Sequence, residues 1–429
     1  MSSPTPTSRF TPDRLRHSLL SQGGAQVFKL LVSIGIGGWM ARYLGPQNLG
    51  TLSYVAALVG LLGPLGSLGV NGSLSAMLCE ERPLPGLLGS ALLIEIVGTL
   101  VIAVVLIPFA WAARDPVVVG LIGLGVVGNL LGSSEVFQVE LLNRQQGTQL
   151  AQLGTIQTIA GAFLSVTALL AQAPLLVFGS LPVIQAGIGA CLLAVAAQAA
   201  KPVQLLKQAS WETIRALVKR GLPLLLAGLS VALYMKSDQV MLEWLRGPAD
   251  VGQYSVSVKV AESLYFLPVV LSNTFLPRIG RGSGQFDSDA ELRQLYRSAW
   301  LLGVGMTLAS MFLLPPLVPI VFGDEFLPAQ AALVWLGPAA FAVATGCASG
   351  AWLNRQGHQK LIAQRSVIGA LVNIGLNFLL IPSMGLTGAA LATSVSYLAS
   401  VYLVGILRAE ISTNLINLVF PFRHAAVQG

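Results

Sequence analysis

Long apolar segments alternate with short polar ones along the whole chain. A helix needs about 20 apolar residues to cross the hydrocarbon core of a membrane, so segments of this length predict spans. Pro174 and Pro382 separate the most closely spaced pairs, because proline removes a backbone donor and disfavours helix before it. About twelve spans are predicted, at 25–43, 51–70, 87–111, 116–138, 153–171, 175–199, 222–245, 254–276, 299–322, 331–353, 361–381 and 386–407.

Two polar patterns occur twice in this apolar background. The first is a polar island, "LNRQQGTQLAQ" from Leu142 and "LNRQGHQKLIAQ" from Leu353. The second is Gly-Pro-x-x-aliphatic-Gly, which begins at Gly45 and again at Gly247, 202 residues later. A shift of about six spans preserves orientation, so the chain is predicted to hold two parallel repeats related by an axis along the membrane normal.

The repeated patterns favour architectural roles. Gly-Pro permits a tight external turn between antiparallel helices. Both islands follow a span at its predicted cytosolic end, where an asparagine can cap the helix and an arginine can meet the inner leaflet. We interpret the island as a topological anchor in preference to a ligand-binding motif.

Composition defines the class of protein. The chain is 54% hydrophobic and only 10% charged, whereas soluble domains carry about 25% charged residues. These values predict an all-α polytopic membrane protein. The three cysteines and three histidines are scattered, so no metal site or disulfide framework is expected. No GxxxxGK[ST] motif occurs, so neither a nucleotide nor another cofactor is implied.

The basic residues predict the orientation of the chain. With the N-terminus in the cytoplasm, 19 Lys and Arg residues fall on the inner side and three on the outer side. Both termini are therefore expected in the cytoplasm, and the net charge of +7 faces anionic lipid, not nucleic acid. The predicted parts are a polar leader at 1–24 that is not a secretory signal, a six-helix bundle at 25–199, an amphipathic inner-leaflet linker at 200–221, a second bundle at 222–408 and a tail at 409–429.

Several segments resemble one family of transporters. "ARYLGPQNLGTLSYVAALVGLLGPLGSLGV" is similar to the first hairpin of polysaccharide-biosynthesis flippases, which belong to the multidrug/oligosaccharidyl-lipid/polysaccharide exporter superfamily. "LYMKSDQVMLEWLRGPADVGQYSVSVKVAESLYFLPVVLSNTFLPRIGR" resembles the start of their second half, and "NIGLNFLLIPSMGLTGAALATSVS" their last two spans. The resemblance covers about 25–408. It implies two six-helix bundles around a central cavity with alternating access.

The same resemblance implies a substrate and a location. The family typically flips undecaprenyl-diphosphate-linked oligosaccharides from the inner to the outer leaflet of the bacterial inner (plasma) membrane, for O-antigen, capsule or exopolysaccharide synthesis. A polysaccharide polymerase and other assembly proteins would then be partners. No enzymatic activity is expected.

Charges within the spans are the candidate site residues, because each costs roughly 2.5–3.5 kcal/mol at mid-bilayer and must face a cavity or a partner. An electropositive cavity would suit a diphosphate headgroup. The alternatives are snorkelling for Lys29 and mutual neutralisation for Lys259 and Glu262, which share a helix face. The predicted cavity residues are Lys29, Lys236, Asp238, Lys259, Glu262, Asn373 and Asn377.

Some of these polar residues have a second interpretation. Asp238 matches an acidic position common in the resembled family, and it and Glu95 are candidates for ion coupling. The alternative for Glu95 is a neutral carboxyl hydrogen-bonded to a neighbouring helix, and Glu135 is expected to be solvated near the cytosolic rim. Asn373 and Asn377 lie on one helix face, where they could bind sugar hydroxyls or join helices.

Three other functions remain alternatives. A cation-coupled multidrug exporter of the same superfamily would favour a mostly acidic cavity, whereas the candidate cavity residues here are both basic and acidic. A membrane-embedded polysaccharide polymerase or ligase needs a substantial external loop or clustered external catalytic residues, and the outer connections are short and lack histidine. A peptidoglycan-precursor flippase resembles the repeat but usually carries extra C-terminal spans.

Overall fold

The computed structural model describes residues 12–79, 86–113, 115–197, 202–275 and 288–403. In these ranges the chain is helical, without strands, as the apolar pattern predicts. Inside a membrane only helices or closed barrels satisfy every backbone polar group. The first half contains α1 (Pro12–Ser67), α2 (Val70–Leu78), α3 (Leu87–Ala113), α4 (Pro116–Gly132), α5 (Glu135–Asn143), α6 (Gly147–Leu170) and α7 (Leu175–Ala196).

The second half begins after a short connecting helix, α8. We call residues 12–197 the N-half and residues 211–403 the C-half. The remaining elements are α8 (Pro202–Lys207), α9 (Trp211–Arg246), α10 (Pro248–Glu262), α11 (Phe266–Phe275), α12 (Ser288–Leu308), a π turn (Ala309–Leu313), α13 (Leu317–Phe322), a 3-10 turn (Asp324–Phe326), α14 (Pro328–Arg355), α15 (Gln359–Met384), α16 (Leu386–Leu398) and a final π turn (Ala399–Leu403).

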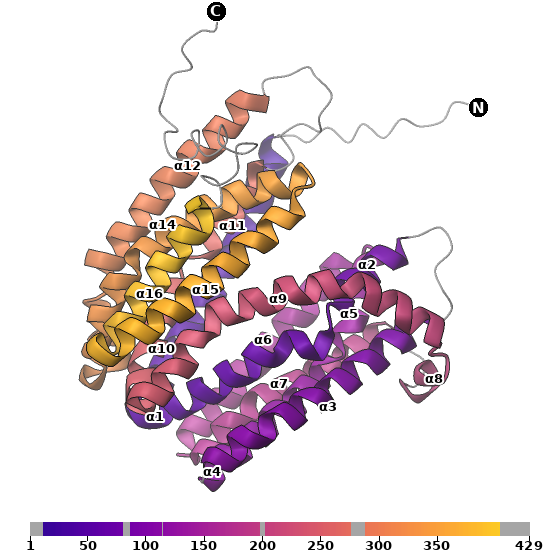
Figure 1. Ribbon diagram of the computed structural model, residues 1–429, viewed down its shortest axis with the longest axis horizontal. Helices are drawn as coiled ribbons and strands as arrows, with labels where there is room; N and C mark the ends of the chain where they lie inside the picture. The colour runs from indigo at the N-terminus through magenta and orange to yellow at the C-terminus, as the bar shows by residue number, and fades with distance from the viewer. Residues whose placement is uncertain (1–11, 80–85, 114, 198–201, 276–287, 404–429) are drawn as a thin grey trace, which may run out of the picture.

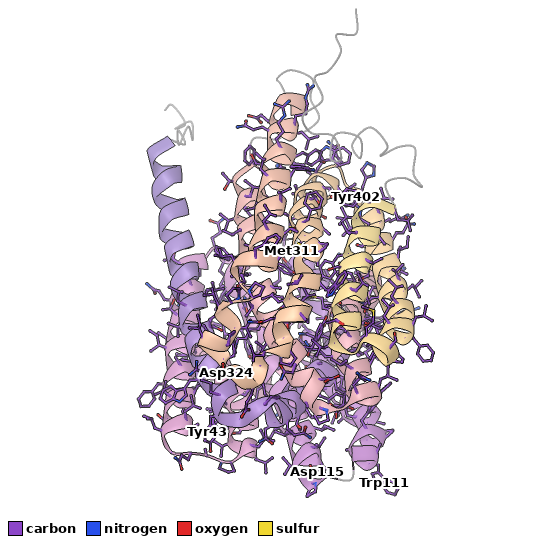
Figure 2. All side chains as sticks on the ribbon, turned by 90° about the vertical axis from the view of Figure 1, so that its left-hand side faces the viewer. Tyr43, Trp111, Asp115, Met311, Asp324 and Tyr402 are labelled. Atoms are coloured by element: carbon purple, nitrogen blue, oxygen red, sulfur yellow. The ribbon has the colours of Figure 1, made fainter. Side chains whose placement is uncertain are left out.

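The two halves form two helical bundles, with α1, α9 and α10 between them (Figure 1). We call the end that carries Tyr43, Trp111 and Asp115 the outer end, following the predicted orientation (Figure 2). The opposite end, which carries the N-terminal part of α12, is the inner end.

The span count agrees with the prediction of about twelve once two differences are considered. Ten segments of the described chain are long and apolar enough to cross a membrane. The first of them, Leu30–Leu78, contains predicted span two and residues 30–43 of predicted span one, because α1 continues through its bend at Gly45. The predicted ninth span, 299–322, does not appear as one helix. A π turn and the adjacent Pro315 and Pro316 interrupt it, since proline cannot donate the helical hydrogen bond.

The predicted amphipathic linker is not a single helix. Ser210 is extended, and its hydroxyl caps α9 by accepting a hydrogen bond from the Thr213 amide at 3.2 Å. The described part of the predicted linker, 202–221, is thereby divided into α8 and the first turns of α9. With 36 residues, α9 is about 54 Å long and extends beyond the hydrocarbon. The predicted linker and seventh span thus share one continuous helix.

The repeated Gly-Pro pattern turns the chain at equivalent places. Gly45 (φ 68°) bends α1, and Gly247 (φ 94°) separates α9 from α10. Positive φ favours glycine because it has no Cβ. The two copies also touch one another. A Cβ on Gly50 would lie 1.6 Å from the Pro248 carbonyl oxygen, and one on Gly252 would lie 2.0 Å from that of Pro46. The reciprocal contact is what a two-fold relation between parallel repeats produces.

The two polar islands end their helices by backbone geometry. Gln145 and Gly357 both have positive φ, and the next amides, of Gln146 and His358, bond back to the carbonyls of Leu141 and Leu353. This is the Schellman arrangement. The asparagines of the islands therefore do not cap these helices, which corrects the sequence interpretation. The side-chain oxygen of Asn143 instead accepts from the Cys79 thiol at 3.3 Å.

Gly50→Ala and Gly252→Ala are expected to lower the thermal unfolding midpoint of the purified protein. Each methyl would meet a backbone carbonyl, and overpacking of this kind costs about 1–3 kcal/mol. Gly60→Ala is the matched control, because it lies in α1 with nothing within 4 Å of the new Cβ. An equal midpoint for Gly50→Ala and Gly60→Ala would show that the contact does not constrain the helices.

Candidate functional site

A cavity of about 380 Å³ lies between the two halves, and we call it the inter-half cavity. The bent helix α1 of the N-half forms one wall, and α9 and α10 of the C-half form the other. Of the predicted cavity residues, Lys236, Lys259 and Glu262 line it. Lys29 lies within α1, but its side chain is outside the described part of the structure. The other polar lining residues are Ser33, Ser53, Gln239, Ser255 and Ser263.

Lys259 reaches across the cavity toward the N-half. A Cβ built on Gly37 of α1 would lie 2.2 Å from the Lys259 Nζ, so the absence of a side chain there makes room for the ammonium group. Among the described residues, no ion pair within 4.0 Å joins Lys259 to Glu262. Lys259 and Glu262 therefore do not form the ion pair that their spacing on one helix face suggested. The ammonium is directed at the partner half of the protein.

Asp238 lies in a separate group of polar side chains inside the C-half, which we call the buried polar cluster: Asp238, Tyr254, Asn373, Asn377 and Thr393. Asp238 is only 3% exposed. It accepts hydrogen bonds from the Tyr254 hydroxyl, from the Thr393 hydroxyl at 3.3 Å and from the Gln239 amide at 2.7 Å. Burial of a carboxylate requires such partners. Asp238 is thus well satisfied and does not line the inter-half cavity.

The two asparagines belong to the same cluster. Asn373 accepts from the Ser237 hydroxyl and from the Asn377 amide, both at 2.8 Å, and donates to the Ser396 hydroxyl at 3.3 Å. Both asparagines are 0% exposed and lie outside the inter-half cavity. This placement corrects the grouping of Asn373 and Asn377 with the cavity lysines, and it favours the alternative in which they join α15 to α9 and α16.

Glu262 connects the cavity with the buried polar cluster. Besides lining the inter-half cavity, it borders a narrow internal pocket together with Asp238, Tyr254 and Thr393. Tyr234 and Tyr397 of the same pocket stack with ring centroids 4.2 Å apart. A carboxylate therefore stands between the lysine-bearing cavity and the cluster that holds Asp238.

Glu95 lies in the N-half, far along the chain from the other candidates. It lines a different pocket of about 360 Å³, together with Glu135, Asn71 and Asn129. Glu95 is 4% exposed, and neither of its carboxylate oxygens has a hydrogen-bond partner. The Asn71 amide of the neighbouring helix α2 is close enough to act on the Glu95 carboxyl, so the alternative of a carboxyl bonded to a neighbouring helix stays open. Glu135 is exposed, as expected near the rim, and accepts from the Asn71 amide at 3.3 Å.

Sequence reasoning missed three residues that the structure brings into these sites. Tyr254 donates to Asp238. Asn71 and Asn129 line the pocket of Glu95. A polar amide inside an apolar span is the signal that could have indicated both asparagines. Across the described residues, no three His, Cys, Asp or Glu side chains gather in a way that could hold a metal ion.

Known proteins share this sequence pattern and fold. Residues 17–282 match the profile of a family described as polysaccharide biosynthesis protein, and residues 223–379 match the MatE profile. The chain is 21% identical over 391 residues to a protein named probable low-salt glycan biosynthesis flippase Agl15 from Haloferax volcanii, covering 90% of this chain and 80% of that one.

Two solved structures have the same fold. An inward-facing multidrug resistance MATE family transporter of the MOP superfamily aligns with a TM-score of 0.71 and 13% identity, over 92% of this chain and 96% of that one. The lipid II flippase MurJ, in an inward closed conformation, aligns with a TM-score of 0.70 and 15% identity, over 93% and 91%. These likenesses support two bundles of helices, as predicted.

Tyr254→Phe is expected to destabilise the protein by about 1–3 kcal/mol, because it leaves a buried carboxylate short of a donor. Tyr43→Phe is the matched control, since the Tyr43 hydroxyl bonds the Ala173 carbonyl at an exposed site near the outer end. Chemical or thermal unfolding of both variants provides the measurement. Equal stability of the two would contradict a structural role for the Tyr254–Asp238 bond.

Proposed function

This chain belongs to the polysaccharide biosynthesis protein family, whose profile matches more than half of its length, and we propose from this membership that it is a flippase for lipid-linked oligosaccharides. The proposed substrate is an undecaprenyl-diphosphate-linked oligosaccharide destined for O-antigen, capsule or exopolysaccharide. The direction is from the inner to the outer leaflet. The name of the Haloferax volcanii relative, a glycan biosynthesis flippase, supports this class of substrate.

The observation that carries the proposal is the pair of lysines in the inter-half cavity. Lys236 and Lys259 come from the C-half and face α1 of the N-half, where Lys29 is predicted to join them. Lysine binds phosphate as a compact charge and donates up to three hydrogen bonds. A diphosphate could therefore be held between the halves. The serines and Gln239 offer hydrogen-bond partners to the first sugar, while the prenyl chain stays in lipid.

Movement of the substrate requires the two halves to alternate. The reciprocal glycine contact holds α1 against α10 toward the outer end, so it would have to separate before a headgroup could leave on that side. The neighbouring Leu49 and Val251 belong to one hydrophobic core, so separation of the contact would also open that core on the outer side. We therefore propose that the two Gly-Pro repeats act as the outer closure in an alternating-access cycle.

Energy for the cycle is proposed to come from an ion gradient, the membrane potential or consumption of the product. One charge that crosses 100 mV releases about 2.3 kcal/mol, so a few coupled charges suffice. Asp238 and Glu95 remain the candidates for ion coupling. The proposal involves no nucleotide, cofactor or covalent chemistry.

The proposed setting follows from the same family membership. The protein would lie in the bacterial inner membrane as a multi-pass protein with both termini in the cytoplasm. A polysaccharide polymerase and other assembly proteins would consume the flipped product. Residues 12–24 of the predicted leader form the beginning of α1, whereas the predicted tail at 409–429 lies outside the described residues. The division into domains stays a prediction.

A multidrug exporter is the second candidate, because the MatE profile matches 223–379 and a MATE transporter shares the fold. Exported drugs are often cationic and would favour a mostly acidic cavity. Two lysines and one glutamate in the inter-half cavity oppose that preference. Competition experiments distinguish the two candidates. Glycolipid diphosphates should inhibit transport if the protein is a flippase, whereas organic cations should inhibit transport if it is a multidrug exporter.

Lys236→Ala and Lys259→Ala are each expected to slow flipping about tenfold or more. A hydrogen bond to a charged group contributes about 1.5–3 kcal/mol, and 1.4 kcal/mol corresponds to a factor of ten. Flipping of an undecaprenyl-diphosphate-linked glycan in proteoliposomes is the measurement. Lys219→Ala is the matched control, because Lys219 is exposed on the same helix α9 outside the cavity. Full transport by both cavity variants would refute the proposed diphosphate site.

Deletion of the gene from its natural host is expected to trap lipid-linked repeat units on the cytoplasmic face. The physical reason is that a charged diphosphate cannot cross the hydrocarbon unaided. Accessibility of the repeat units on each face of membrane vesicles provides the measurement. Normal surface polysaccharide in the deletion strain would rule against the proposed function and favour drug export.

A further inference from the structure

A further cavity, of about 540 Å³, lies between the halves at the outer end of the protein, and we call it the outer pocket. Helices α1, α3 and α4 of the N-half and α9 and α10 of the C-half form its walls. Asp115, which Figure 2 labels at the outer end, lines it, and so does Pro248 of the second Gly-Pro turn. Its volume falls within the range of about 300–1,000 Å³ that is typical of small-molecule sites.

An aromatic platform stands in the outer pocket. The rings of Trp244 and Phe109 stack with centroids 6.1 Å apart and planes at 18°. The Trp244 Nε1 donates a hydrogen bond to the Tyr54 hydroxyl at 3.4 Å. Trp244 is nevertheless 62% exposed, so much of the indole is left for a ligand. A tryptophan of the interfacial aromatic belt is anchored in lipid, whereas this one is held between α1 and α3 of the other half.

Polar groups surround this platform. One carboxylate oxygen of Glu243, Oε2, is buried without a hydrogen-bond partner. Asp115 is exposed, and its Oδ1 accepts from the Val117 amide at 2.8 Å. The Tyr54 hydroxyl accepts from Trp244, and among the described residues no acceptor takes its own proton. With the exposed amide of Gln47, the pocket therefore offers both acceptors and donors to a ligand.

The combination of groups selects the chemical class of the ligand. A sugar ring presents C–H groups on its faces and hydroxyls at its edges, so it can stack on an indole while its hydroxyls bond to carboxylates. Among the described residues that line the outer pocket there is no lysine, arginine or histidine, so a diphosphate would be repelled. Aromatic rings with carboxylates also suit organic cations. The Tyr54 hydroxyl and the Gln47 amide oppose that choice, because an ammonium group has no acceptor for them.

We propose that the outer pocket binds an uncharged sugar unit of the glycan, with Trp244 as the stacking platform, Glu243 and Asp115 as acceptors for its hydroxyls and Tyr54 as a donor. The assignment separates the chemistry of the substrate into two places. Lysines in the inter-half cavity suit the charged diphosphate, whereas the acidic and aromatic outer pocket suits the sugars. Each site excludes the part of the substrate that the other binds.

The two sites follow one another along the same helices. Ser53 of α1 lines the inter-half cavity and the adjacent Tyr54 lines the outer pocket. On α9, Lys236 lines the first and Glu243 the second, seven residues or about 10 Å further toward the outer end. Sugars ahead of the diphosphate would therefore reach the outer pocket when the outer closure separates. This order rests on the proposed flippase function, whereas sugar binding itself does not.

Saturation-transfer NMR on the purified full-length protein tests the site. The probe is the free repeat-unit oligosaccharide of the host's own surface polysaccharide, without lipid or phosphate. Saturation transfer to the sugar protons is expected, and Trp244→Ala and Glu243→Gln are each expected to weaken the affinity at least tenfold. Glu243→Gln keeps the shape of the side chain, so it tests the site even where Trp244→Ala lowers stability.

Two matched controls lie outside the outer pocket. Trp111 is 86% exposed at the outer end, and Glu325 is an exposed glutamate of the 3-10 turn, so Trp111→Ala and Glu325→Gln should leave binding unchanged (Figure 2). No binding by the unmodified protein, or equal binding by Trp244→Ala and Trp111→Ala, would overturn the proposal. Binding of tetraethylammonium in place of the oligosaccharide would also overturn it and assign the pocket to organic cations.

Transport of the lipid-linked glycan in proteoliposomes separates this proposal from the proposed function. Normal flipping without oligosaccharide binding would reject the sugar site and leave the flippase standing. Oligosaccharide binding that depends on Trp244 and Glu243, without any flipping, would support the site and reject the flippase.

Discussion

The backbone of α1 and the backbone of α10 touch at Gly50 and Gly252, each against the carbonyl of the opposite Gly-Pro turn. In lipid there is no hydrophobic force to press helices together, so close packing of small residues has to do this. Because the contact is reciprocal, it sets the two-fold relation between the halves. The inter-half cavity and the reach of Lys259 toward Gly37 both depend on that placement.

The two repeats use the same architecture for different chemistry. In the C-half, polar side chains from α9, α10, α15 and α16 bond to one another, and Asp238 is enclosed by donors, while the side-chain oxygen of Asn377 has no partner. In the N-half, interrupted helices leave Glu95 and Asn71 with unpaired oxygens.

The candidate site was only partly predictable from the sequence. Intramembrane charge indicated Lys236, Lys259 and Glu262, because a charge in hydrocarbon must face a cavity or a partner, and these three do share one cavity. The same rule grouped Asp238 with them. The structure instead places the Asp238 carboxylate against the Tyr254 hydroxyl, in the buried polar cluster of the C-half. The position of a charged residue within an apolar span shows that it lies in the membrane. It does not show which neighbouring helix the side chain faces.

By itself, the sequence determined the helical class, the number and approximate limits of the spans, and the parallel repeat. The length of an apolar segment and a repeated glycine pattern can be seen directly in the sequence. The membrane requires spans of a certain length and a helical backbone within them. Only the tertiary structure decided that the two Gly-Pro turns meet each other and that the Glu95 carboxylate is buried without a hydrogen-bond partner within 3.5 Å. It also decided that the backbone at Gln145 and Gly357 ends the helices at the two polar islands. Each of these depends on the rotation of one helix against another, which packing between distant segments sets.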